Sequence, residues 1–128
     1  PPKKALILGT GGASSAVAFV LKKLNIEFCH ISRSAGANAI EYNKVDEKVM
    51  KEHHLIINAS PLGTFPDIQL APQLPYSFLT NDHVLFDLIY NPPETRFLQE
   101  GKTRGCRTLN GQKMLEYQAE KSWQIWNQ

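Results

Sequence analysis

The stretch Lys4-Ala5-Leu6-Ile7-Leu8-Gly9-Thr10-Gly11-Gly12-Ala13-Ser14 decides how the rest of the chain is interpreted. Residues 5–8 are consecutively apolar, which is the pattern of a strand buried on both faces in a parallel sheet. Three glycines follow within four positions, and a helical pattern begins at Gly12. The stretch therefore predicts a buried strand, a tight turn and a helix start in direct succession.

This succession is the first half of a dinucleotide-binding βαβ unit. Gly9 would allow the sharp turn, and Gly11 would let the backbone approach a pyrophosphate with no Cβ in the way. Free N–H groups at the start of the next helix would then face the phosphates. Ser14 fills the third small position of the fingerprint. Glycine turns are common, so the flanking strand and apolar helix carry the prediction.

The composition describes an ordinary globular domain of 128 residues, 42% apolar and 20% charged. A formal charge of +2 is too small to indicate nucleic acid. No apolar run approaches the ~18 residues of a membrane span. Two cysteines, Cys29 and Cys106, give neither a disulfide framework nor a metal site. We therefore expect a cytoplasmic protein that binds no metal, nucleic acid or membrane. Pro1 is not a natural translation start, so we expect further sequence upstream.

The remaining pattern alternates strands with helices, which predicts a Rossmann-like, doubly wound α/β fold. We expect a mainly parallel sheet of about six strands with helices on both faces. Whether residues 39–42 form a parallel edge strand stays open. The expected strands are 5–8, 26–31, 40–42, 55–59, 84–89 and 106–109, and the expected helices are 12–24, 45–52, 94–104 and 112–126.

The residues after the second strand indicate which dinucleotide is bound. NAD-binding proteins usually place a carboxylate there for the ribose 2′-hydroxyl. Here the sequence is Ser32-Arg33-Ser34, and Glu27 lies at the opposite end of that strand. A guanidinium between two hydroxyls suits a 2′-phosphate. The pattern favours NADP over NAD, the alternative being a solvated arginine in a loop.

The strand at 55–59 runs into a polar cluster, Asn58-Ala59-Ser60-Pro61-Leu62-Gly63. Ligands bind at such strand ends in open α/β sheets. Ordinary turn and cap chemistry is an equally weighted interpretation of Asn58 and Ser60. The chain's histidines have no Ser, Cys or carboxylate at useful spacing, so we interpret them as structural or solvated: His30, His53, His54 and His83.

Five stretches, taken in order, resemble the carboxyl-terminal domain of shikimate dehydrogenase, the NADP-dependent enzyme of aromatic amino-acid biosynthesis. The resemblance runs through nearly the whole chain. The stretches are Gly9-Thr10-Gly11-Gly12-Ala13-Ser14, Ser32-Arg33-Ser34, Asn58-Ala59-Ser60-Pro61-Leu62-Gly63, Asp87-Leu88-Ile89-Tyr90-Asn91-Pro92, and Asn110-Gly111 followed by Met114, Leu115 and Gln118.

The resemblance implies a role for each matching position. Tyr90 and Gln118 would reach the substrate, and Leu88 and Gly111 the nicotinamide. The catalytic lysine and aspartate of the family lie in an amino-terminal domain that residues 1–128 do not include. The other implied cofactor contacts are Gly9, Gly11, Gly12 and Ala13 at the pyrophosphate, Ser32, Arg33 and Ser34 at the adenosine phosphate, and Asn58.

Three departures from the family pattern stand out. Ser32 and Ser34 replace the usual Asn and Thr, Gln112-Lys113 replaces Leu-Gly, and the helix usual after Ser34 is missing. The implied parent enzyme reduces 3-dehydroshikimate reversibly to shikimate with NADPH. Alternatives are a quinate/shikimate dehydrogenase and a non-catalytic, regulatory nucleotide-binding module. The isolated chain is expected to bind nucleotide weakly, if at all, and to be inactive.

Overall fold

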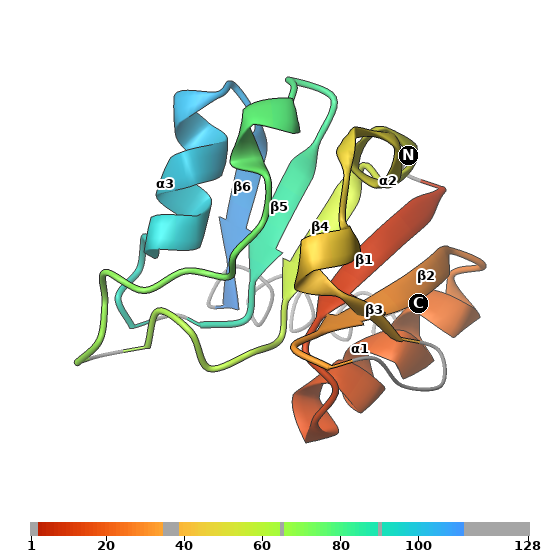
Figure 1. Cartoon of the computed structure of the whole chain (residues 1–128). Coiled ribbons are helices and arrows are strands. Elements are labelled where there is room, and N and C mark those ends of the chain that lie inside the picture. Colours follow the sequence, from red (N-terminus) through yellow and green to blue (C-terminus); the bar gives the residue numbers. More distant parts are fainter. Residues whose placement is uncertain (1–2, 35–38, 65, 90, 112–128) are drawn as a thin grey trace, which may run out of the picture.

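The computed structural model describes residues 3–34, 39–64, 66–89 and 91–111. In this part of the chain six strands form one sheet, every neighbouring pair is parallel, and the order is β3-β2-β1-β4-β5-β6 (Figure 1). The predicted doubly wound parallel sheet is confirmed. The strands are β1 (Lys4–Leu8), β2 (Glu27–Ser32), β3 (Ala39–Glu41), β4 (Leu55–Asn58), β5 (Val84–Asp87) and β6 (Arg107–Asn110).

Helices cover both faces of the sheet (Figure 1). On one face, α1 (Gly12–Lys23) packs Val17, Ala18 and Leu21 against β1 and β4. On the other face, α2 (Glu47–Glu52) and α3 (Arg96–Thr103) bury their apolar side chains in a second cluster. Two 3-10 turns that the sequence pattern did not predict also occur, η1 (Tyr42–Lys44) and η2 (Tyr76–Phe78).

The helix ends follow from local chemistry. Thr95 precedes α3 and its hydroxyl accepts a hydrogen bond from the Leu98 N–H at 3.2 Å. Asp46 caps α2 in the same way through the Val49 N–H at 2.9 Å. Gly105 follows α3 with φ of 82°, a left-handed conformation that glycine adopts without strain. Gly11 precedes α1 and supplies no side-chain cap.

The connection from β2 to β3 is unusually short for parallel strands, which normally need a dozen or more residues between them. Only residues 33–38 join the two strands. This is possible because β3 pairs solely with the last three residues of β2, from His30 to Ser32. The chain therefore has to return by about two residue rises, or ~7 Å. The edge strand that the sequence pattern left open therefore exists, in parallel orientation, at Ala39–Glu41.

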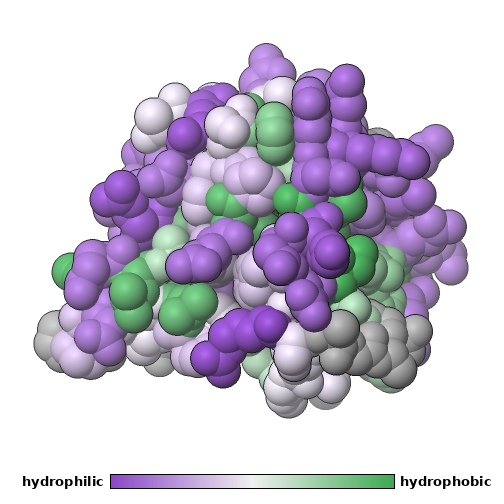
Figure 2. All heavy atoms as spheres, in the orientation of Figure 1, coloured by the Kyte–Doolittle hydropathy of each residue, from purple (hydrophilic) through white to green (hydrophobic). Residues whose placement is uncertain are grey.

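The surface seen in Figure 2 is mostly polar, with apolar residues in small separate groups. Within the described ranges no helix is long and apolar enough to span a membrane. The predicted closing helix at 112–126 lies outside the described residues.

Substitution of Phe97 tests which apolar contacts hold the sheet and the helices together. The Phe97 side chain is fully buried, so Phe97→Ala should lower the free energy of unfolding by about 3–5 kcal/mol. Phe19, on the exposed side of α1, is 60% accessible, and Phe19→Ala should change it by at most about 0.5 kcal/mol. Urea denaturation of both variants measures the difference, and equal losses would contradict the assignment of the core.

Candidate functional site

Loops from four strands meet at the carboxyl edge of the sheet and enclose a cavity of about 310 Å³. Because all six strands are parallel, their carboxyl ends lie at the same edge. The strand order reverses between β1 and β4, because β2 and β3 extend the sheet on one side of β1 and β4 to β6 extend it on the other. The cavity lies at this reversal. Its lining residues are Gly9, Thr10, Gly11, Ser32, Arg33, Tyr42, Ala59, Ser60, Pro61 and Leu62.

The glycines of the turn after β1 differ in what a side chain at each position would meet. Gly9 has φ of 113°, and a Cβ there would lie 3.1 Å from Ser14 Oγ and 3.4 Å from the Ala59 carbonyl carbon. The fold itself therefore requires glycine at this position. Gly11 and Gly12 are exposed, and a Cβ on either would meet no atom within 4 Å. The space beside these two glycines is open to a ligand.

The start of α1 is electropositive and uncapped. No side chain caps Gly11, and the first turn holds no acidic residue. The free N–H groups and the helix dipole favour an anion here. Ser14 lies in this turn, and its hydroxyl is fully buried without a hydrogen-bond partner among the described residues. A buried hydroxyl without a hydrogen bond costs free energy, so a partner that forms a hydrogen bond with the Ser14 hydroxyl would be favoured.

Arg33 lies between two cavities. It lines the one described above and also a neighbouring cavity of about 450 Å³, which Tyr42 and Leu62 likewise border. Burial raises the pKa of Tyr42, and the positive charge of Arg33 partly opposes this shift. Ser32 forms a small turn in which its hydroxyl donates to the Ser34 carbonyl at 2.5 Å and accepts from the Ser34 N–H at 3.2 Å.

Asn58 is fully buried, and its side chain is bonded within the protein. Its Nδ2 donates to Leu62 O at 3.3 Å and Asp87 Oδ1 at 3.2 Å. Its Oδ1 accepts from the Ser60 N–H at 3.1 Å and the Ser60 hydroxyl at 2.6 Å. These bonds favour the turn-and-cap interpretation of Asn58 and Ser60. Asn58 acts on the cavity by fixing the shape of the loop that lines it.

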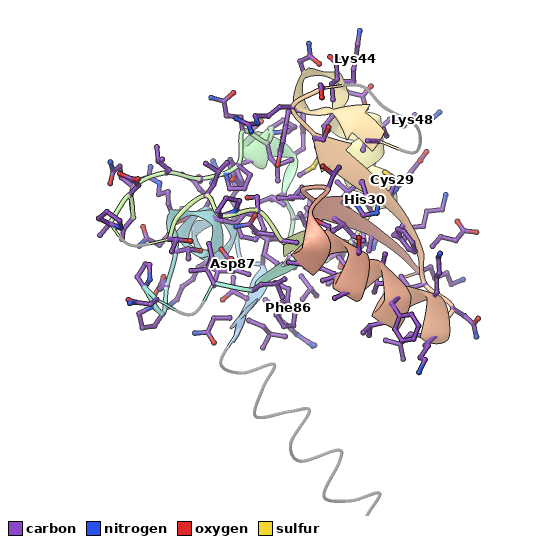
Figure 3. The ribbon with its side chains drawn as sticks, turned by 90° about the horizontal axis from the view of Figure 1, so that it is seen from below. Cys29, His30, Lys44, Lys48, Phe86 and Asp87 are labelled. Carbon is purple, nitrogen blue, oxygen red and sulfur yellow. The ribbon has the colours of Figure 1, made fainter. Side chains whose placement is uncertain are left out.

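Asp87 extends this network across the end of β5. It accepts from the Thr95 hydroxyl at 2.6 Å and from the Ile89 N–H at 3.0 Å, besides Asn58. Burial raises the pKa of the Asp87 carboxyl, although all three hydrogen bonds act in the opposite direction. In Figure 3, Asp87 lies on the α3 side of β5 and Phe86 on the other side, as strand alternation requires.

Leu88 and Gly111 lie side by side after β5 and β6. The Leu88 N–H donates to Asn58 O at 3.1 Å, and a Cβ on Gly111 would collide with the Leu88 carbonyl oxygen. Glycine is therefore required here by close packing. Neither residue lines the cavity at the glycine turn. Tyr90 and Gln118, the predicted substrate contacts, lie outside the described residues, as does Lys113.

The structure thus brings Gly9, Gly11, Ser32 and Arg33 together around one cavity. Gly12 and Ala13 are exposed at the adjoining helix start. Sequence reasoning did not identify Tyr42 as a lining residue, although its place directly after the edge strand could have indicated it. Within the described part of the chain no group of three His, Cys, Asp or Glu residues could hold a metal ion.

Shikimate dehydrogenases are among the known proteins that match nearly the whole chain. A shikimate dehydrogenase (NADP(+)) of Methanococcus maripaludis is 39% identical over 138 residues, covering 97% of this chain and 49% of that protein. The crystal structure of shikimate 5-dehydrogenase from Thermus thermophilus in complex with NADP(H) and shikimate is 31% identical, with a TM-score of 0.74. It covers 95% of this chain and 48% of that one.

The fold is shared with an enzyme of another name. A ligand-free 5-ketofructose reductase of Gluconobacter is 30% identical, with a TM-score of 0.75 over 88% of this chain and 46% of that one. No protein-family model matches the chain. The chain spans about half the length of the curated relatives it matches.

The raised pKa of Asp87 predicts a pH dependence of stability. The folded chain binds the Asp87 proton more tightly than the unfolded chain does. The contribution of this proton to the free energy of unfolding is therefore complete below the pKa of Asp87 in the unfolded chain, and it is lost as the pH rises through the pKa in the folded chain. Asp87→Asn removes the titration. The free energy of unfolding of the variant minus that of the wild type should therefore increase from acid to neutral pH.

Urea denaturation at a series of pH values measures this difference, with Asp67→Asn in the exposed loop as the matched control. A difference for Asp87→Asn that varies with pH no more than the difference for the control would show that burial does not shift the pKa of the Asp87 carboxyl.

Proposed function

We propose that this chain, which is homologous over nearly its whole length to one half of the NADP-dependent shikimate dehydrogenases, is the NADP-binding half of such an enzyme. The observation that carries the proposal is the cavity at the reversal point, where the glycine turn and Arg33 meet. The complete protein would reduce 3-dehydroshikimate reversibly to shikimate with NADPH, in the cytoplasm and in the route to aromatic amino acids.

The residues at the start of α1 fit a pyrophosphate. Gly11 and Gly12 leave open the space that a Cβ would fill, and the helix start presents N–H groups that no side chain caps. Ala13 follows in the same exposed turn. The buried Ser14 hydroxyl supplies one more group without a partner at this place. Phosphate oxygens are acceptors, and donors are what this turn offers.

The residues after β2 fit a 2′-phosphate. Arg33 borders the same cavity as the glycine turn, and no Asp or Glu is among the residues that line it. A guanidinium can hold a phosphate through two parallel hydrogen bonds. The hydroxyls of Ser32 and Ser34 lie in the same exposed turn. Glu41 borders the neighbouring cavity and does not line the one at the glycine turn. A ribose without the phosphate would therefore find no carboxylate in the cavity at the glycine turn, and we propose selection of NADP over NAD.

The bound cofactor would supply the hydride, and the role of this chain would be to hold it in place. Asn58 and Asp87 fix the loop after β4, and Leu88 and Gly111 would border the nicotinamide. Hydride transfer requires the substrate at reacting distance from that ring. We propose that Tyr90 and Gln118 contact the substrate from this half, and that the other half of the relatives' length supplies the catalytic lysine and aspartate.

Two alternatives make different predictions. A quinate-using relative would take NAD, which a carboxylate after β2 would favour, and Ser32-Arg33-Ser34 holds none. It would also differ in the substrate that the complete protein turns over. A regulatory nucleotide-binding module would bind NADP without any need for Tyr90 or Gln118. The shared fold of a 5-ketofructose reductase shows that the fold does not determine the substrate. Assay of the complete protein with shikimate and with quinate separates these possibilities.

Arg33→Ala is the sharpest test of the cofactor site. Loss of a charge-assisted contact to the 2′-phosphate should weaken NADPH binding by about 1.5–3 kcal/mol, whereas NADH binding should scarcely change. Calorimetric titration of wild type and variant with both dinucleotides measures the effect.

Arg107→Ala is the matched control, because Arg107 is an exposed arginine at the start of β6, the opposite edge of the sheet. It should leave both affinities unchanged. Equal weakening of NADPH and NADH by Arg33→Ala would contradict the 2′-phosphate assignment.

A further inference from the structure

His30 is the one histidine of the described residues that contacts the glycine turn. It lies near the end of β2, is half-buried, and its Nδ1 is 3.1 Å from the Gly9 carbonyl oxygen (Figure 3). A carbonyl oxygen can only accept a hydrogen bond, so Nδ1 carries the proton and donates it. The tautomer with hydrogen on Nδ1 is therefore fixed by this contact.

The turn is anchored at successive backbone groups. The Leu8 carbonyl accepts from the Ala59 N–H at 3.0 Å, and the Gly9 N–H donates to Ile31 O at 2.8 Å. The Gly9 carbonyl is then held by His30. Beyond this point, within the part of the chain that the structure describes, no hydrogen bond holds Thr10, and α1 begins without a side-chain cap. His30 therefore provides the last anchor before the open glycines.

A contact with a neighbouring aromatic ring supports the orientation of the His30 imidazole. The Phe28 ring meets it edge to face, with centroids 5.7 Å apart and an interplanar angle of 89°. Phe28 and His30 share one face of β2, the face on which α1 packs. The next residues along the strand are Ser32 and Arg33, which border the cavity. One strand thus carries both the anchor of the glycine turn and the arginine.

We propose that His30 is a positioning residue for the cofactor: it holds the glycine turn in the geometry that receives the pyrophosphate. The proposal rests on the proposed function. Because the pyrophosphate is common to NADPH and NADH, loss of His30 weakens both dinucleotides by the same factor. This separates its role from that of Arg33, which acts on the 2′-phosphate alone.

Two variants of this chain separate the hydrogen bond from the ring. His30→Phe keeps an aromatic ring against Phe28 and removes the donor. His30→Asn removes the ring and keeps an amide N–H close to the position of Nδ1, so it should restore the bond to Gly9. Removal of one such bond should raise the Kd of NADPH and of NADH about threefold to tenfold in His30→Phe, and His30→Asn should stay within about twofold of wild type.

A second readout needs no cofactor. The Gly9 amide is protected by its bond to Ile31 O, so its hydrogen exchange reports local opening of the turn. In His30→Phe this amide should exchange about threefold to tenfold faster. The Leu88 amide, bonded to Asn58 O, should keep its wild-type rate and serves as the internal control.

NMR titration with NADPH and with NADH, together with hydrogen exchange, measures all of these effects in the same samples. Equal behaviour of His30→Phe and His30→Asn, unchanged Gly9 exchange in His30→Phe, or weakening of NADPH alone would each overturn the proposal. If the wild type responds to neither dinucleotide, the proposed function fails and the role of His30 fails with it. When the wild type binds a dinucleotide, the results for the two His30 variants decide whether His30 has the proposed role.

Discussion

The parallel pairing of all six strands is the constraint on which the site depends. It brings the carboxyl ends of β1, β2, β3 and β4 to one edge, so that turns far apart in the sequence border one cavity. The register of the strands aligns these carboxyl ends, because Leu8 pairs with Ile31 on one side and with Asn58 on the other. Each turn therefore leaves the sheet at the same height. A shift of register between β1 and β2 would separate Arg33 from the glycine turn.

Two kinds of support hold the loops at this edge. The buried network of Asn58, Asp87 and Thr95 ties β4, β5 and the start of α3 together and fixes the loop after β4. The His30 contact fixes the turn after β1. Glycines leave space free instead of making contacts: Gly11 and Gly12 border open space, and the proposed ligand site consists of exposed backbone N–H groups. Polar side chains buried near the cavity thus support the backbone that lines the proposed ligand site.

Patterns among residues that are close in the sequence were sufficient to predict most of the fold and part of the candidate site. A buried apolar run, a glycine turn and a cap residue such as Thr95 are readable in sequence, because each depends on neighbours along the chain. The edge strand Ala39–Glu41 could not be decided, because it exists only through pairing with β2. The contact of His30 with Gly9 and the place of Tyr42 beside Arg33 depend on register between strands. Asn58, predicted as a possible ligand contact, is engaged by partners 4 and 29 residues away.

The most direct test of the account is a map of where NADP⁺ binds, from the backbone amide shifts of this chain in an NMR titration. The account predicts that the largest changes fall on the amides of Gly11, Gly12 and Arg33 at the carboxyl edge, and that NAD⁺ at the same concentration changes Arg33 far less. Changes centred at the opposite edge, around Asn25 and Phe28, would contradict it. So would an identical response of Arg33 to both dinucleotides.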